Sequence, residues 1–198
     1  MKIRKLAAVF CVLTFAMVGV ANADTYGNTT PFEAMSSHSP NYVLGVQVVV
    51  PIAFELQSFG MMYGHEEFGA PLADNAIFGL YSTDVTNGYP MDLMAVTGAH
   101  YLDSVAIYDN LAFTSTPIIP AGTYWMMALY ETGANPRMGL LDSSSLVAYW
   151  SNSYGAGMPA SAPAVSTYLG QNFNYWINGV PGGTSTVEST WSGVKSLY

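Results

Sequence analysis

Large aromatic side chains close to asparagines are the residues of this sequence best suited to binding chemistry. Exposed rings stack on the C–H faces of sugars, and amide groups hydrogen-bond sugar hydroxyls. The ring candidates are Trp125, Tyr149, Trp150, Tyr154, Trp176 and Trp191, and the amide candidates are Asn152, Asn172, Asn174 and Asn178. Trp176 is the strongest, because strand alternation places it on one face with Asn172, Asn174 and Asn178. We predict ligand binding by Trp176, Asn174, Asn178, Trp150, Tyr154 and Trp125, with core packing as the alternative for each ring.

Acidic residues could support metal or acid–base chemistry. Asp74, Asp84 and Asp92 are weak calcium candidates, together with Asn75 and Asp142, because Ca²⁺ takes oxygen ligands. The sequence has no EF-hand spacing, so calcium stays a possible ligand without a defined site. The run 65–67 (His-Glu-Glu) is the densest ionisable cluster, but neighbouring side chains on an extended chain point apart, which favours a solvated loop.

Two strand-associated acids raise the alternative of a small glycoside hydrolase. Such an enzyme needs two carboxyl groups roughly 5 to 9 Å apart across one cleft. Glu55 and Glu131 lie in or at the end of predicted strands. The sequence lacks a nucleophile elbow, a phosphate loop, a His-Glu-x-x-His motif and a dinucleotide fingerprint. We therefore predict no catalytic residues and no cofactor, and keep the hydrolase as an alternative.

The first 23 residues have the pattern of a signal peptide. Basic residues at Lys2, Arg4 and Lys5 precede an apolar run, and Ala21-Asn22-Ala23 supplies the small residues of a cleavage site. The run is too short to span a bilayer easily. We predict cleavage after Ala23 and export to the periplasm, the cell surface or the extracellular space. The mature chain would then contain no thiol, because the single cysteine lies in the apolar run.

The charge balance of the mature chain restricts its partners. Arg137 and Lys195 would be the only basic residues left against 13 acidic ones. Such a chain repels phosphate backbones and anionic lipid surfaces. We expect no nucleic-acid binding and no membrane insertion. Neutral glycans, cations and protein surfaces remain possible partners.

Short apolar blocks separated by Gly, Pro and Asn predict an all-β domain. The predicted strands are 42–50, 53–63, 76–82, 91–97, 104–108, 111–115, 123–131, 146–150 and 172–177. The strand 123–131 is apolar on both faces, so it should be central, with its outer side covered. The stretch 154–163 should be a surface loop. We predict a single jelly-roll-like β-sandwich over 24–181, followed by a Ser/Thr/Gly-rich tail, 182–198, that is disordered or adds one strand.

Three segments carry a resemblance to a known group of proteins. They are Ala76–Ser82, the turn that leads to Met91–Ala95, and Ile119–Met126, which contains Ala121-Gly122-Thr123-Tyr124-Trp125. Together they resemble a loosely defined family of secreted bacterial jelly-roll β-sandwich modules, over roughly residues 42–150. The resemblance implies an extracellular module of the kind found beside glycan-active or adhesive domains. It implies no catalytic residues.

These observations favour a non-enzymatic, exported module that recognises a glycan or a protein surface through aromatic and amide side chains on one sheet. A self-assembling fibre or matrix subunit is the main alternative. Its support is the content of 51% hydrophobic residues and a fold rich in sheet edges, which allow strand addition between copies. A homo-oligomer is therefore also possible.

Overall fold

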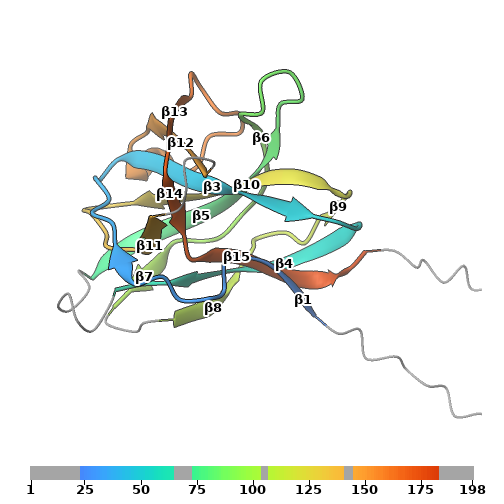
Figure 1. Ribbon diagram of the computed structural model, residues 1–198, viewed down its shortest axis with the longest axis horizontal. Coiled ribbons are helices and arrows are strands. Elements are labelled where there is room, and N and C mark those ends of the chain that lie inside the picture. The colour runs from blue at the N-terminus through green and yellow to red at the C-terminus, as the bar shows by residue number, and fades with distance from the viewer. Residues whose placement is uncertain (1–22, 65–72, 104–106, 141–144, 183–198) are drawn as a thin grey trace, which may run out of the picture.

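The computed structural model describes residues 23–64, 73–103, 107–140 and 145–182 (Figure 1). Apart from a 3₁₀ turn at Tyr154–Ala156, the regular elements of these residues are strands. The strands are β1 (Asp24–Gly27), β2 (Ala34–Met35), β3 (Tyr42–Val50), β4 (Phe54–Met62), β5 (Asp74–Thr83), β6 (Pro90–Val96), β7 (His100–Leu102), β8 (Ile107–Ala112), β9 (Ile118–Ile119), β10 (Gly122–Tyr130), β11 (Arg137–Leu140), β12 (Leu146–Ser151), β13 (Ser166–Leu169), β14 (Gln171–Phe173) and β15 (Tyr175–Pro181). No helix in the described ranges is long and apolar enough to cross a membrane.

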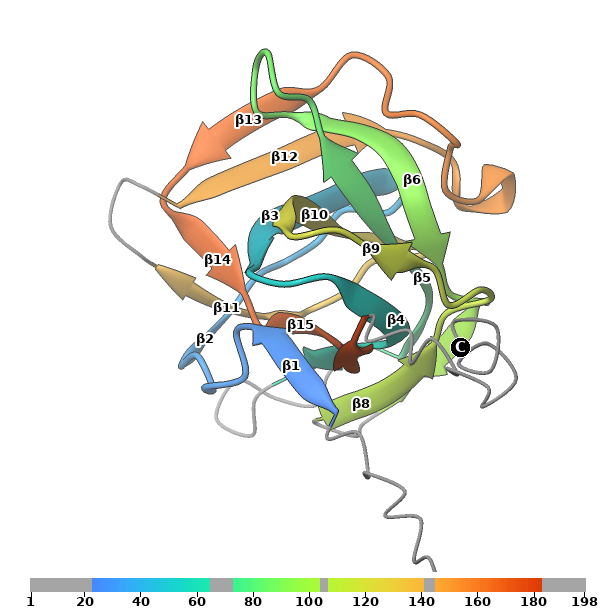
Figure 2. The same cartoon turned by 90° about the vertical axis from the view of Figure 1, so that its right-hand side faces the viewer.

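The strands form two large antiparallel sheets and one small sheet. The seven-stranded sheet has the order β13-β12-β3-β10-β5-β6, with β7 also paired to β5. The five-stranded sheet has the order β1-β15-β4-β8, with β9 paired to β4. The third sheet, β14-β11-β2, lies on one side between the two large ones (Figure 2). The predicted all-β sandwich is therefore confirmed.

The main core fills the space between the sheets. Alternate residues of each strand point into it, as the two-residue period of a strand requires. Phe59 of β4 stacks on Phe78 of β5, with ring centroids 4.7 Å apart. The hydroxyls of Tyr130 and Tyr175 are 2.9 Å apart inside this core, so each buried phenol has a partner.

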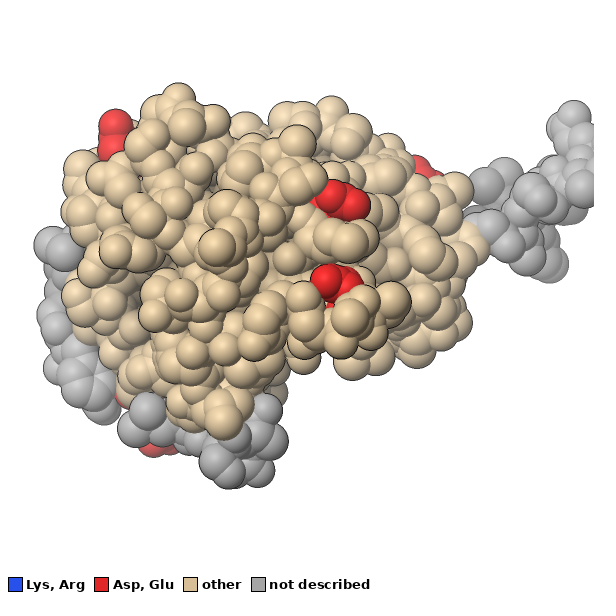
Figure 3. Space-filling view, turned by 90° about the horizontal axis from the view of Figure 1, so that it is seen from above, with Lys and Arg blue, Asp and Glu red and all other residues tan. Residues whose placement is uncertain are grey.

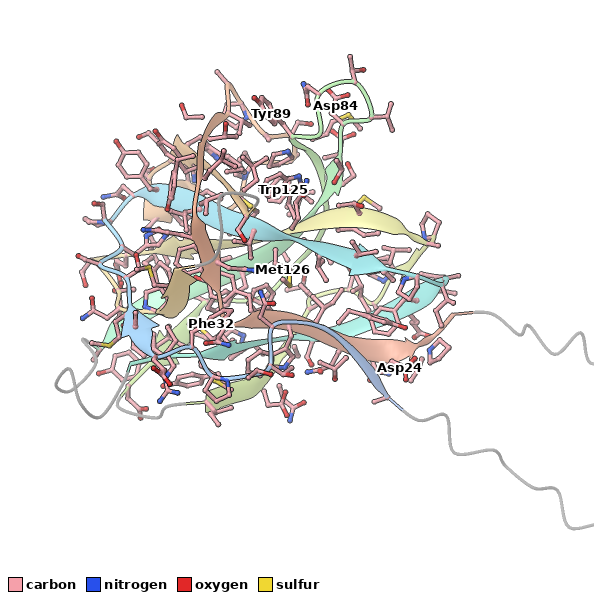
Figure 4. The ribbon with its side chains drawn as sticks, viewed as in Figure 1. Asp24, Phe32, Asp84, Tyr89, Trp125 and Met126 are labelled. Atoms are coloured by element: carbon pink, nitrogen blue, oxygen red, sulfur yellow. The ribbon has the colours of Figure 1, made fainter. Side chains whose placement is uncertain are left out.

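The central strand β10 buries both of its faces. Figure 4 shows Trp125 on the outer side of the strand and Met126 on the inner side, between the layers. The outer residues belong to a second buried cluster, which contains Val43, Tyr81, Trp125, Met127, Leu129, Ala148 and Trp150. The segment 152–165, here called the strap, covers this cluster with Tyr154, Met158, Ala162 and Val165. The sequence correctly predicted a covered central strand.

Several strand boundaries differ from the predictions. One strand, β8, replaces the two expected at 104–108 and 111–115, of which residues 104–106 lie outside the described ranges. The strand predicted at 172–177 is interrupted at Asn174, where the chain passes from the small sheet (β14) to the five-stranded sheet (β15). Six short strands were not predicted, namely β1, β2, β7, β9, β11 and β13. All six have only two to four residues, too few to show a period.

Candidate functional site

A groove of about 300 Å³ opens at the end of the sandwich where β3 begins. Its lining comes from the segment before β3 and from β3, β12 and β13. The lining residues are Ser36, Ser37, His38, Ser39, Tyr42, Leu44, Tyr149 and Tyr168. Ligand pockets commonly start at this volume, and they combine aromatic surface with a few polar groups in the same way. We call this feature the tyrosine groove.

Strand register brings the three tyrosines of the groove together. Tyr149 of β12 lies opposite Leu44 of β3 and opposite Ser166 of β13. Tyr42 lies two residues before Leu44, and Tyr168 lies two residues after Ser166. All three rings therefore project from one face of the sheet as diagonal neighbours. The ring centroids of Tyr42 and Tyr149 are 6.4 Å apart, and those of Tyr149 and Tyr168 are 5.8 Å apart.

These tyrosines are partly open to solvent. Tyr42 is 39% exposed, and Tyr149 and Tyr168 have intermediate exposure. The Tyr168 hydroxyl donates a hydrogen bond to Gln171 Oε1 at 2.9 Å, which fixes the direction of its ring. Burial raises the pKa of Tyr168, so its phenol stays protonated at neutral pH. The groove therefore offers ring surface and a neutral hydroxyl at the same place.

A serine-rich segment, residues 36–39, forms another part of the lining, here called the groove wall. Its backbone is held by the loop before β11, since His38 N donates to Ala134 O at 2.7 Å and Ala134 N donates to His38 O at 3.2 Å. Ser36 N also donates to Pro136 O at 3.0 Å. Hydroxyls on a fixed backbone can both donate and accept, which suits a ligand rich in hydroxyl groups.

His38 lies beneath this wall and is 4% exposed. Its ring packs edge-on against Tyr130 at 4.8 Å, and Nδ1 lies 3.1 Å from Ser39 O. Burial lowers the pKa of His38 to about 4, although the Ser39 carbonyl and the Asp74 carboxylate both oppose this shift. The imidazole is therefore neutral at pH 7. A neutral ring next to a carbonyl donates from Nδ1, which leaves Nε2 as a buried acceptor without a partner in the described structure.

The tryptophans that were predicted to bind ligand lie in the interior instead. Trp125 is fully buried, and its Nε1 donates to Gly88 O at 3.1 Å. Trp150 is 3% exposed and packs edge-on against Tyr81, with centroids 5.5 Å apart. Tyr154 belongs to the strap that covers them. The burial of Trp125 and Trp150 supports the alternative of core packing for both rings, because the strap occupies the surface on which a sugar would stack.

Trp176 is also 3% exposed, so the expected exposed ring is absent there too. It lies opposite Gly60 of β4, where its indole occupies the space that a Cβ atom would need. Its Nε1 donates to Asp109 Oδ1 at 2.8 Å. Asn178 is on the same face, and its Nδ2 donates to Asp109 O at 2.8 Å. These side chains tie β15 to the edge strand β8.

Asn174 is fully buried and has a structural role. Its Nδ2 donates to the carbonyl oxygens of Asn28 and Thr30, at 3.0 and 2.6 Å, and its Oδ1 accepts from Phe32 N at 2.8 Å. The amide thus holds the segment between β1 and β2 and has no group directed to solvent. The strand alternation that placed Asn174 beside Trp176 does not apply, because the chain changes sheet at this residue.

The predicted acidic sites do not assemble. Glu55 lies near the end of the sandwich where β4 begins, and Glu131 directly follows β10 at the opposite end. The eight-residue span between these ends is on the order of 25 Å, well beyond the spacing of a glycosidase pair. Glu131 Oε2 accepts from Asn75 Nδ2 at 2.6 Å.

The three calcium candidates have separate protein partners. Asp74 is buried and accepts from the backbone amides of Thr132 and Gly133, Asp84 accepts from Thr86 N, and Asp92 accepts from the Ser161 hydroxyl. Within the described ranges no three His, Cys, Asp or Glu residues group as metal ligands would. Residues 65–67, Asp142 and Trp191 lie outside those ranges, as does the tail from residue 183.

Of the residues that line the groove, the sequence singled out only Tyr149, as one of the ring candidates. Tyr42 and Tyr168 each lie in a strand, but only the register of β3, β12 and β13 brings them to Tyr149. The run Ser36-Ser37-His38-Ser39 was the available signal, since three hydroxyls around an imidazole are an unusual composition for a connecting segment. Comparison of the sequence with models of known protein families and with curated proteins gave no match.

Proposed function

We propose that the protein is an exported, non-enzymatic recognition module that binds a glycan in the tyrosine groove. The observation that carries this proposal is that three neighbouring, partly exposed tyrosines and three serines line one groove. Rings offer flat surface to sugar C–H faces, and hydroxyls satisfy the ligand's own hydroxyls. A volume of about 300 Å³ suits one or two sugar units.

The test of this proposal is binding of the mature chain, residues 24–198, to a glycan array. Tyr149→Ala should weaken the selected interaction at least tenfold, because Tyr149 is the central ring of the three. Tyr42→Ala should weaken it less. Tyr101→Ala is the matched control, since Tyr101 is 65% exposed on β7 and does not line the groove. Equal loss in the control, or no loss in Tyr149→Ala, would refute the assignment of the groove.

Export after cleavage at Ala23 is part of the proposal. It is supported by the position of β1, which begins at Asp24 and pairs with β15, so the expected cleavage would leave every described strand intact. The intact mass of the secreted protein checks this. A mature species that begins well after Asp24 would remove β1 and contradict the expected site.

Strand addition between copies has weaker support. The β6 edge is already bonded to the strap, since Leu93 N donates to Ala160 O and Ala162 N donates to Met91 O. The β8 edge has an irregular register with β4 and carries Asp109. Bulges, covering segments and charges are the usual means by which edges are kept from pairing. This alternative predicts filaments at high concentration, which electron microscopy would show.

A further inference from the structure

We infer that the tyrosine groove selects uncharged glycans and discriminates against glycans that carry carboxylates. This inference rests on the proposed function and adds the ligand class to it. It follows from the charges in and around the groove.

The lining of the groove carries no formal charge. Serine, tyrosine and leucine account for seven of its eight residues, and the eighth is His38. His38 could supply a positive charge, but its ring is buried against Tyr130 and burial lowers its pKa to about 4. A carboxylate in the groove would therefore lose part of its hydration without gaining an ion pair, which is costly.

The rest of the molecule would add repulsion. The described residues contain nine Asp and Glu against a single basic residue, Arg137. Arg137 does not line the groove, and its Nε donates to Gly64 O at 2.6 Å. Figure 3 shows one face of the molecule, on which acidic side chains are visible and no Lys or Arg is. At low ionic strength this field extends tens of ångströms, so an acidic glycan is disfavoured before it reaches the groove.

The experiment compares two forms of one oligosaccharide. The neutral form is the best binder from the array, and the acidic form is the same oligosaccharide with its C6 hydroxymethyl groups oxidised to carboxylates. Calorimetry with the mature chain should give at least tenfold weaker binding of the acidic form at about 0.01 M salt, and a smaller difference near 1 M, where charges are screened. Binding of the neutral form should not change appreciably with salt.

Two variants place the same new charge at different sites. Ser37→Lys adds a cation to the exposed part of the groove wall and should reduce the difference in affinity between the neutral and acidic forms. Thr86→Lys adds the cation in the turn between β5 and β6, where Thr86 N donates to Asp84, labelled in Figure 4, and should leave that difference unchanged. Equal or tighter binding of the acidic form by the unmodified chain would overturn the inference, and so would equal effects of the two lysines. If the array yields no glycan, the proposed function fails first and the inference falls with it.

Discussion

The two aromatic clusters of the seven-stranded sheet show how differently similar side chains can be used. On the outer face, Trp125, Trp150 and Tyr81 are at most 3% exposed beneath the strap. On the inner face, at the end where β3 begins, Tyr42, Tyr149 and Tyr168 remain partly exposed. Tyr149 and Trp150 are adjacent in sequence and belong to different clusters. The two clusters differ in solvent exposure because another segment covers one of them and not the other. The residue types alone do not show which cluster is covered.

The largest expected effect is on the covered cluster. Trp125→Ala removes a fully buried indole and its hydrogen bond to Gly88 O, and should lower the free energy of unfolding by about 4 kcal/mol. Tyr101→Ala, at a site 65% exposed, should change it by less than about 0.5 kcal/mol. Urea denaturation monitored by fluorescence measures both. A loss below about 1 kcal/mol for Trp125→Ala would show that the strap does not seal the cluster.

The buried histidine of the groove wall, His38, should make the stability of the fold depend on pH. The pKa of His38 is lowered by burial to about 4 in the folded chain, against about 6.5 when the chain is unfolded. Between these values the unfolded chain binds a proton that the folded chain does not. The free energy of unfolding should therefore fall as the pH drops from 6.5 to 4, by about 3 kcal/mol in total from this residue. As the pH rises above 6.5 the slope from His38 should fade, and it should be absent above about pH 8, where the imidazole is neutral in both states.

Urea denaturation at several pH values between 7 and 4 tests this effect. His38→Asn should flatten the slope, because the asparagine amide can still donate to Ser39 O but does not titrate. His100→Asn is the comparison variant: burial lowers the pKa of His100 as well, but that ring is only partly buried, so its substitution should flatten the slope less. An unchanged slope in His38→Asn would mean that the wall is open enough to hydrate a charged imidazole.

The sequence predicted more of the fold than of the site, for a physical reason. Strands such as 42–50 and 123–131 carry their own two-residue period, so local patterns were enough to find them. A site made by diagonal neighbours on three strands depends on register, which a single sequence does not contain. Trp176 illustrates the limit. Its alternation with polar residues predicted exposure, but Gly60 on the neighbouring strand leaves space into which the indole packs.

The smallest expected changes in unfolding free energy come from removing one tyrosine hydroxyl in each cluster. The Tyr81 hydroxyl donates to Pro159 O at 2.7 Å and anchors the strap, and the Tyr168 hydroxyl donates to Gln171 Oε1 at 2.9 Å beside the groove. Tyr81→Phe leaves the strap carbonyl without this donor and should cost about 1 kcal/mol of unfolding free energy. Tyr168→Phe should cost less than about 0.5 kcal/mol, because water can reach its partner.

These two substitutions each remove one hydroxyl oxygen, so the volume lost is the same in both. The difference between their unfolding free energies therefore shows how well each cluster is covered from solvent. Differential scanning calorimetry of the two variants and the unmodified chain measures it, since for a domain of this size 1 kcal/mol shifts Tm by about 2 to 4 °C. A larger shift for Tyr168→Phe than for Tyr81→Phe would reverse the comparison. The tyrosines of the groove would then be the better covered cluster, and the cluster beneath the strap would be the more open one. The tryptophans beneath the strap would become the ligand-binding candidates.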